Sequence, residues 1–264
     1  MATVAMLVDT TLCTGCRGCQ VACKQWWDLP GEPTRNRGSY ENPLNLSPTT
    51  WTRVRFHEIE AEQGLQWYQV AWGCLHCTEA ACVDVCPTRA LKHNALGFVS
   101  LEEDLCNGCG YCATACPFDI PRLERNALTG RGKATKCNLC QDRVTQGLIP
   151  ACAKTCPPGA IRFGERGKMV ALGSARAESL RGNGFQEANL YGADILGGLG
   201  RMYVLAMRPA AYGIPERPTY PVLMRRWQHI ARPLGQVAIV ATLVGLCANW
   251  LATWRLRSKT REEA

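Results

Sequence analysis

Sixteen of the 17 cysteines in this chain of 264 residues fall into four groups of four, and this pattern limits the possible folds more than any other feature. Cysteines repeated in tight groups bind metal, so the fold has to bring each group around a centre. The first and third groups share the spacing C-x2-C-x2-C-x3-C, the second has C-x2-C-x4-C-x3-C, and the fourth has eleven residues between its middle pair. In chain order the groups are Cys13, Cys16, Cys19 and Cys23; Cys74, Cys77, Cys82 and Cys86; Cys106, Cys109, Cys112 and Cys116; and Cys137, Cys140, Cys152 and Cys156.

The sequence around these groups repeats as well. Residues 8–13 resemble residues 101–106, and residues 88–91 parallel residues 158–161. A proline follows the last cysteine of three groups, and Lys24 takes its place in the first group. An internal repeat of this kind predicts several copies of one structural unit.

The spacing has a chemical meaning. Three thiolates within seven residues surround one corner of an iron–sulfur cubane, while the fourth cysteine opens the following helix and points away. In two-cluster ferredoxins that fourth cysteine ligates the other cluster. The four groups therefore predict an α+β chain with two bacterial-type two-cluster ferredoxin folds, and four [4Fe–4S] clusters as cofactors.

Other metal and disulfide chemistry fits this pattern less well. Zinc prefers two separated cysteine pairs in a tetrahedral site, so a zinc-bound structural scaffold is the weaker alternative. An odd cysteine count does not suit a chain held together by disulfides alone. The first nine residues lack a charged start followed by a long apolar stretch, so we expect no Sec signal peptide there.

The net charge is explained by the same clusters. The chain carries a formal charge of +8, which by itself would raise nucleic acid as a partner. Four clusters, each with about −2 including its thiolates, offset that excess. No basic–aromatic pattern supports nucleic-acid binding, so we expect none.

The chain divides by composition. Residues 1–163 hold the tandem ferredoxin-like domains, with an insertion over 25–73 in which 51–60 and 65–70 partly alternate and predict strands. Residues 164–232 are rich in Gly and Pro and predict an extended segment that contacts a partner. Residues 233–254 are apolar, and residues 255–264 form a basic tail.

Several residues outside the cysteine groups could have a functional role, but a structural role is favoured for each of them. Trp26 and Trp27 are expected in the core or at an interface. His76 lies inside the second group, whose ligand set is complete without it, so we expect a role beside the cluster or at the surface. The run 197–200 lacks the strand–helix context of a dinucleotide site and predicts a loop. His229 is expected at the membrane edge. No nucleophile–base arrangement stands out, so no catalytic residue is expected.

The apolar segment predicts a transmembrane helix. Its 22 residues would span about 33 Å, close to the hydrocarbon thickness of about 30 Å. Small residues recur every three or four positions, which predicts one face that packs closely on a partner helix. The basic tail favours a cytoplasmic C-terminus. The expected packing residues are Ala238, Ala241, Gly245, Ala248, Asn249 and Ala252.

The layout of the whole chain resembles the iron–sulfur subunits that accompany molybdopterin enzymes, and is most similar to the beta subunit of membrane-bound formate dehydrogenase. Nitrate, dimethyl-sulfoxide and polysulfide reductase partners share the cysteine motifs, so the same role in such an enzyme is an alternative. The insertion, the tail and the single terminal helix favour formate dehydrogenase. The stretches that carry the resemblance are residues 13–23, 40–43, 106–112, 116–123 and 202–205.

The resemblance implies a function and a ligand pairing. A catalytic alpha subunit with molybdenum or tungsten would oxidise formate, and this non-catalytic chain would pass electrons to a cytochrome b subunit and quinone. The cluster domains would lie on the periplasmic side of the inner membrane, with one span in the lipid. Group one would pair with group four and group two with group three. The implied ligand sets are Cys13, Cys16, Cys19 and Cys156; Cys23, Cys137, Cys140 and Cys152; Cys74, Cys77, Cys82 and Cys116; and Cys86, Cys106, Cys109 and Cys112.

Overall fold

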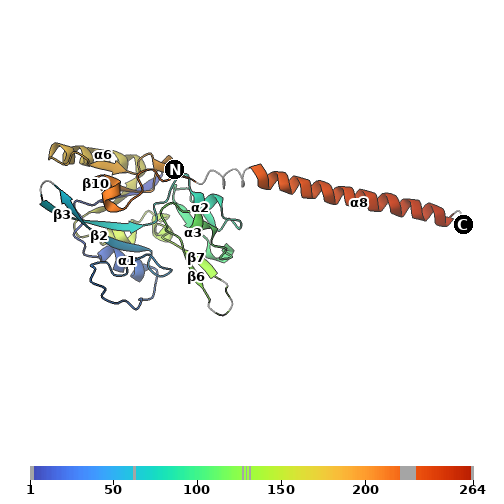
Figure 1. The fold of residues 1–264 in the computed structure, drawn as a ribbon, viewed down its shortest axis with the longest axis horizontal. Coiled ribbons are helices and arrows are strands. Elements are labelled where there is room, and N and C mark those ends of the chain that lie inside the picture. Colours follow the sequence, from blue (N-terminus) through green and yellow to red (C-terminus); the bar gives the residue numbers. More distant parts are fainter. Residues whose placement is uncertain are drawn as a thin grey trace. The chain divides into compact units, whose positions relative to one another are not determined.

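The computed structural model describes residues 3–61, 64–126, 128, 130, 132–220 and 230–262, without the side chains of residue 61 and of residues 255–262. The chain forms two compact units, residues 1–220 and residues 221–264, and each is described by itself. The first unit mixes short helices with four small sheets, and the second contains one long helix (Figure 1).

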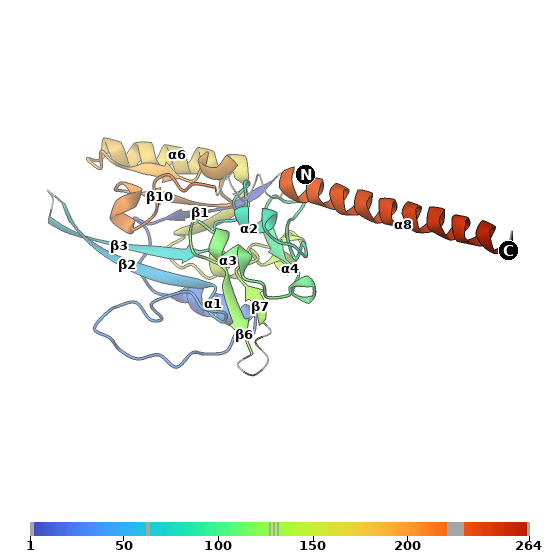
Figure 2. The same cartoon turned by 45° about the vertical axis from the view of Figure 1, so that its right-hand side comes forward.

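A four-stranded sheet in the order β8-β1-β10-β9 forms the core of the first unit. Its strands are β1 (Val4–Asp9), β8 (Ile161–Glu165), β9 (Asn189–Tyr191) and β10 (Arg201–Leu205). β1 pairs in parallel with β10 and antiparallel with β8, so the two ends of this unit's sequence meet in one sheet. Helix α6 (Arg166–Gly182) runs along one face of it (Figures 1 and 2).

Short helices follow or contain part of each cysteine group. They are α1 (Gly18–Trp26), α2 (Ala81–Asp84), α3 (Tyr111–Ala115), α4 (Gln141–Val144) and α5 (Ala151–Lys154), and α1 packs on α5 while α2 packs on α3. Two small antiparallel pairs, β4 (Leu91–His93) with β5 (Val99–Leu101) and β6 (Arg122–Arg125) with β7 (Gly132–Thr135), accompany α2 and α3. The described part of this unit also contains three single-turn 3-10 helices: η1 (Glu103–Leu105), η2 (Ile195–Gly197) and η3 (Pro209–Tyr212).

The predicted strands within 25–73 are confirmed as a long hairpin of β2 (Thr52–Ala61) and β3 (Gly64–Gly73). The buried end of this hairpin packs on the core sheet through aromatic side chains. Trp72 stacks on Tyr203 with ring centroids 5.8 Å apart, and the Tyr203 hydroxyl donates to the Ala71 carbonyl at 3.2 Å. The hairpin is therefore part of the core at the point where the second cysteine group begins.

The prediction of an extended segment over 164–232 was wrong for its described part. That range holds α6, β9 and β10, and every residue of β10 is buried. Because β10 lies between β1 and β9 in the sheet, a stretch far along the sequence completes the core. Composition did not predict this because Gly and Pro, which are typical of turns, occur throughout the range. The run 197–200 was expected to be a loop: Gly197 ends η2, and residues 198–200 form a buried loop.

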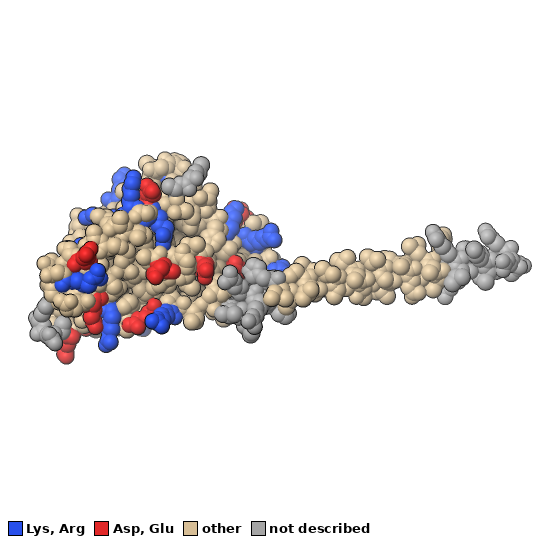
Figure 3. Space-filling view, turned by 90° about the horizontal axis from the view of Figure 1, so that it is seen from above, with Lys and Arg blue, Asp and Glu red and all other residues tan. Residues whose placement is uncertain are grey.

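The second unit agrees with the expected apolar helix. Helix α8 (Arg232–Glu262) includes a stretch, Arg232–Trp254, that is long and apolar enough to cross a membrane by length and composition. Residues 233–254 carry no charge, and the visible face of this stretch is free of charged side chains (Figure 3). His229, expected at the membrane edge, lies outside the described residues.

Candidate iron–sulfur sites

The thiol of Cys23 lies among cysteines of the fourth group and not of its own. Burial raises the pKa of the Cys23 thiol well above its ordinary value, and the next contributions come from Cys137, Cys152 and Cys140. These four side chains come from α1, the loop before α4, and α5, and all four are buried. The packing of α1 on α5 brings the first and fourth groups together.

The other three cysteines of the first group lie near Cys156. Burial raises the pKa of Cys19 to about 12, and Cys13, Cys156 and Cys16 add to that rise. The pKa of Cys13 is raised in the same way, by burial and then by Cys156 and Cys16. Cys16 is exposed, so this set reaches the protein surface.

The second and third groups exchange their last cysteines in the same manner. Burial raises the pKa of Cys77, with further contributions from Cys74, Cys82 and Cys116. Cys116 comes from the third group, and its own pKa is raised to about 11 by burial, with a contribution from Cys74.

Cys86 of the second group lies with the first three cysteines of the third. Burial raises the pKa of Cys112 to about 11, and Cys109, Cys106 and Cys86 are its thiol neighbours. Cys109 is exposed, so this set also reaches the surface. All sixteen predicted ligands thus fall into four sets of four.

The spacing of the thiols suits a cluster better than a single ion. Four thiolates around one zinc ion, with Zn–S distances of about 2.3 Å, would lie about 3.8 Å apart. Among the described residues, no three Cys, His, Asp or Glu side chains come together closely enough to hold one metal ion. The thiols are nevertheless electrostatic neighbours in sets of four, as a larger cubane requires.

Backbone groups point at several of these sulfurs. The amide of Ala134 donates to Cys106 Sγ at 3.3 Å, that of Leu139 to Cys137 Sγ at 3.4 Å, and that of Ile161 to Cys156 Sγ at 3.4 Å. Amide donors to sulfur stabilise the thiolate form and the additional negative charge of a reduced cluster. The loops therefore supply both ligands and donors.

Other predicted residues are placed as follows. His76 is buried, not at the surface: its Nδ1 lies 3.2 Å from the Val99 carbonyl, and burial lowers its pKa well below the ordinary value. Trp27 packs on Trp51 with centroids 5.5 Å apart, as expected of a core contact. Trp26 is exposed and its Nε1 donates to Asp142 at 2.9 Å.

Two cationic side chains are buried near the thiols, and their burial was not predicted from the sequence. Lys136 and Arg201 are 3% and 1% exposed, and both act on the pKa values of neighbouring cysteines. The sequence did offer a signal for Arg201, because it is the one charged residue of a strand that is otherwise apolar. A charged residue is rarely buried without a partner, so its position indicates a special environment.

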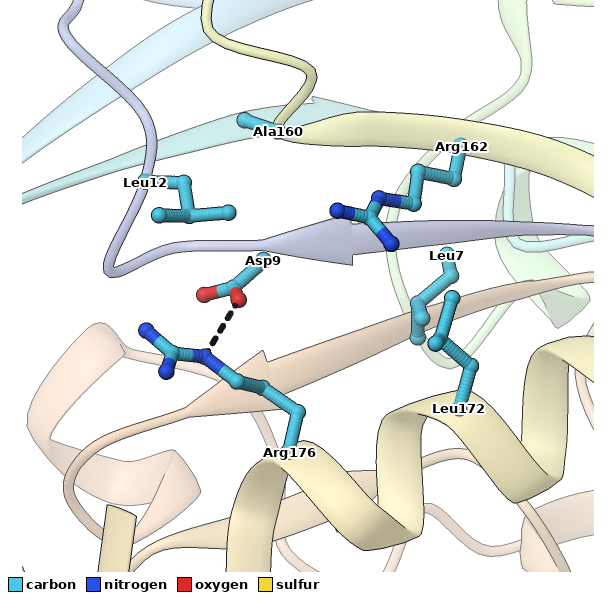
Figure 4. A pocket seen from close by; sticks show the side chains of 7 residues that line it. All are labelled: Leu7, Asp9, Leu12, Ala160, Arg162, Leu172 and Arg176. Carbon is cyan, nitrogen blue, oxygen red and sulfur yellow. Dashed lines mark hydrogen bonds and ion pairs between the residues drawn. The ribbon is translucent and has the colours of Figure 1, made fainter. Parts of the chain in front are cut away.

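A half-open cavity of about 220 Å³ lies beside the loop that leads to Cys13 (Figure 4). Asp9 and Arg176 form an ion pair in it at 2.9 Å, which ties α6 to the end of β1. Arg176 also donates to the Thr11 hydroxyl, which itself donates to Asp9. These contacts hold the loop before the first cysteine group against the sheet. The cavity is lined by Leu7, Asp9, Leu12, Ala160, Arg162, Leu172 and Arg176.

Comparison with known proteins agrees with this geometry. Two models described as a 4Fe-4S dicluster domain match residues 12–90 and 65–166. The chain is 40% identical to the formate dehydrogenase-O iron-sulfur subunit of Escherichia coli, over 98% of this chain and 86% of that protein. It is 39% identical to the nitrate-inducible formate dehydrogenase iron-sulfur subunit of the same organism, over 95% and 85%. It is 42% identical to the formate dehydrogenase 2 subunit beta (cytochrome c-553) of Nitratidesulfovibrio vulgaris, over 65% and 81%.

The cysteine motifs, the dicluster domains and the near full-length similarity have one explanation. The residues present fit [4Fe–4S] clusters, and two of the four thiol sets reach the surface. This chain belongs to the family of formate dehydrogenase iron–sulfur subunits and has an electron-transfer role.

Proposed function

We propose that this chain is the non-catalytic subunit that carries electrons from a molybdenum- or tungsten-containing catalytic subunit to a membrane cytochrome b and quinone. Four [4Fe–4S] clusters would be held by the four thiol sets. The proposal rests on the relatives, which are iron–sulfur subunits of formate dehydrogenases, and on the sixteen cysteines. The catalytic partner subunit would oxidise formate, and formate would not bind to this chain.

The arrangement of the thiols supports a linear order of the four sites. Cys19 of one surface-reaching set is an electrostatic neighbour of Cys152 in the fully buried set. Arg201 is an electrostatic neighbour of both Cys152 and Cys74, and thus links the buried set to the next one. Cys82 of that set is a neighbour of Cys112 in the other surface-reaching set. We call the set of Cys23, Cys137, Cys140 and Cys152 and the set of Cys74, Cys77, Cys82 and Cys116 the inner sites, and the other two sets the outer sites.

The chain's residues would set the conditions for transfer along that order. Each bound cluster would supply a one-electron couple. The thiolates fix the site positions, the amides that donate to sulfur stabilise added negative charge, and the packed core keeps water from the inner sites. The outer sites, with Cys16 and Cys109 exposed, are where partner subunits would exchange electrons.

Metal analysis of the purified complex tests the cofactor content. We expect about sixteen iron and sixteen acid-labile sulfide per chain, four of each per cluster. About four zinc without sulfide would establish the scaffold alternative instead. Addition of formate to the complex with its catalytic subunit should then reduce these clusters. Failure of formate, with all iron present, would point to another molybdopterin oxidoreductase as the partner.

We further propose that α8 crosses the membrane and packs on a helix of the membrane subunit through its small residues. The proposed contact face consists of Ala238, Ala241, Gly245, Ala248, Asn249 and Ala252, all exposed in the isolated chain. A polar amide such as that of Asn249 is costly in hydrocarbon, so a partner across the interface would satisfy it. Lipid would cover the opposite face. The basic residues after Trp254 favour a cytoplasmic C-terminus, with the first unit on the periplasmic side of the inner membrane.

Gly245→Leu should weaken the association of this chain with the membrane subunit and leave its iron content unchanged. A Cβ at Gly245 meets nothing within 4 Å among the residues that the structure describes, so a larger side chain there is expected to act on a partner or on lipid. Close helix approach depends on small residues, and a leucine would force the helices apart. Co-purification in mild detergent measures the effect. Val240→Leu, on the face directed away from this stripe, is the matched control, and equal retention of both variants would refute the docking face.

A further inference from the structure

Arg201 is a charged side chain buried without a carboxylate partner. Its exposed fraction is 1%, and among the described residues no carboxylate forms an ion pair with it. Its Nε and Nη1 atoms have no hydrogen-bond partner. The Tyr203 hydroxyl accepts a bond from the guanidinium, which leaves the positive charge uncompensated by the protein. Burial of an isolated charge is strongly unfavourable, so a counter-charge is expected close to the guanidinium.

The surroundings of Arg201 identify that counter-charge. The cysteines that act electrostatically on the guanidinium are Cys137, Cys152 and Cys74. The backbone agrees for Cys74, because the Arg201 amide donates to the carbonyl of the next residue, Leu75, at 3.0 Å. Cys137 and Cys152 belong to one inner site and Cys74 belongs to the other. The guanidinium thus lies between the two inner sites and near both.

The fold makes room for the guanidinium at this place. A Cβ on residue 73 would overlap Arg201 Nη1 and would lie 2.9 Å from the Trp51 carbonyl oxygen. Gly73 therefore permits the close approach, directly before the ligand Cys74. Lys136, the other buried cation, differs from Arg201 because its Nζ donates to the Val99 and Cys137 carbonyls at 2.7 and 2.9 Å.

We propose that Arg201 is a fixed positive charge shared by the two inner clusters, and that it raises the reduction potentials of both. This inference rests on the proposed occupancy of the four sites by clusters. With clusters in these sites, transfer of one electron from an outer site to the adjacent inner site would oxidise the outer cluster and reduce the inner one by one electron, and no atom would be transferred. A nearby cation stabilises the additional negative charge, and no proton moves because the guanidinium remains protonated throughout. Arg201 is a positioning residue that acts through the clusters and touches no substrate.

The experiment is an EPR-monitored redox titration of the intact complex carrying Arg201→Met. We expect the two inner midpoint potentials to fall most, with an equilibrium constant for reduction lowered about tenfold or more, equivalent to about 59 mV per tenfold for one electron. Cys19 of one outer site is also an electrostatic neighbour of Arg201, so the potential of that cluster should fall less, and the potential of the other outer cluster should not change. The EPR signals that are absent from the Cys23→Ser and Cys116→Ser variants identify which potentials belong to the two inner clusters. Iron analysis of the same samples separates a failure of this inference from a failure of cluster binding.

Two further variants distinguish charge from structure. Arg201→Lys keeps the charge, so the inner potentials should remain near those of the wild type. Arg55→Met is the matched control, because Arg55 is partly buried near Tyr203 but its other main electrostatic neighbours are Arg53 and Glu41. It should leave all four potentials unchanged.

Three results would overturn the proposal. One is unchanged inner potentials in Arg201→Met with a full iron content. Another is a shift in Arg201→Lys as large as that in Arg201→Met. The third result applies if Arg201→Met does not bind its clusters, in which case Arg201→Lys is the deciding variant. Full iron content and wild-type potentials in Arg201→Lys would support the fixed charge. Loss of iron, or of the signals of the inner clusters, in Arg201→Lys would overturn the proposal.

Discussion

Replacing Cys23 by Ser should remove the cluster built on Cys137, Cys140 and Cys152 and leave the cluster of its own group intact. The Cys23 thiol is buried among these three cysteines of the fourth group. A serine hydroxyl is a poorer ligand than a thiolate for an iron–sulfur cluster. Iron should fall from about sixteen to about twelve per chain. Because the lost site is an inner one, transfer between the outer sites should also fall steeply.

Cys247→Ser is the control for that experiment. Cys247 is the seventeenth cysteine, exposed on α8 and outside all four sets, so its replacement should preserve the full iron content. EPR of the reduced Cys23→Ser variant decides the pairing. Selective loss of the cluster on Cys13, Cys16 and Cys19, with the other three intact, would show that each group binds its own cluster.

Gly108→Ala should disrupt the outer site of Cys86, Cys106, Cys109 and Cys112. Gly108 has φ of +71°, and a Cβ there would overlap the Gly132 carbonyl group and lie 2.6 Å from its carbon atom. Because the obstacle is backbone and not the end of a flexible side chain, the loop or β7 has to move. Ala134 on β7 donates its amide to Cys106 Sγ, so that movement would reach the ligands. We expect about twelve iron per chain.

Gly147→Ala is the matched control for this backbone clash. Gly147 has φ of +77°, similar to that of Gly108, but a Cβ there meets nothing within 4 Å. It should therefore cost only the conformational strain of about 1–2 kcal/mol and keep all the iron. Equal iron content in both variants, measured with the signal of this cluster by EPR, would contradict the proposed role of the close approach between Gly108 and Gly132.

The local pattern of the sequence was sufficient to predict the cluster chemistry. Cysteines spaced by two to four residues lie in one loop or at the start of one helix, so their spacing reports directly on the size of the bound centre. The strands of the 52–73 hairpin and the apolar part of α8 were also predicted, because period-two alternation and a long uncharged run are local properties.

The composition of residues 164–232 was misleading for a physical reason. Several of its glycines lie within α6, and α6 and β10 carry Arg176 and Arg201. Both features lowered the apparent hydrophobicity of elements that nevertheless pack on the core. Burial of β10 depends on β1, whose partner residues lie almost two hundred positions earlier in the sequence. The Thr10 hydroxyl donates to the Val204 carbonyl at 2.9 Å across that separation.

Sequence by itself thus predicted that sixteen cysteines bind iron–sulfur clusters and which loops would supply them. Only the tertiary structure decided which sets meet, because the exchange of the fourth cysteines depends on α1 packing on α5 and on α2 packing on α3. The same holds for Arg201, whose place between two buried thiol sets depends on a sheet that joins the two ends of the first unit. Spacing is a local property of the chain, whereas the electrostatic environment of a buried site is a sum over segments that only folding brings together.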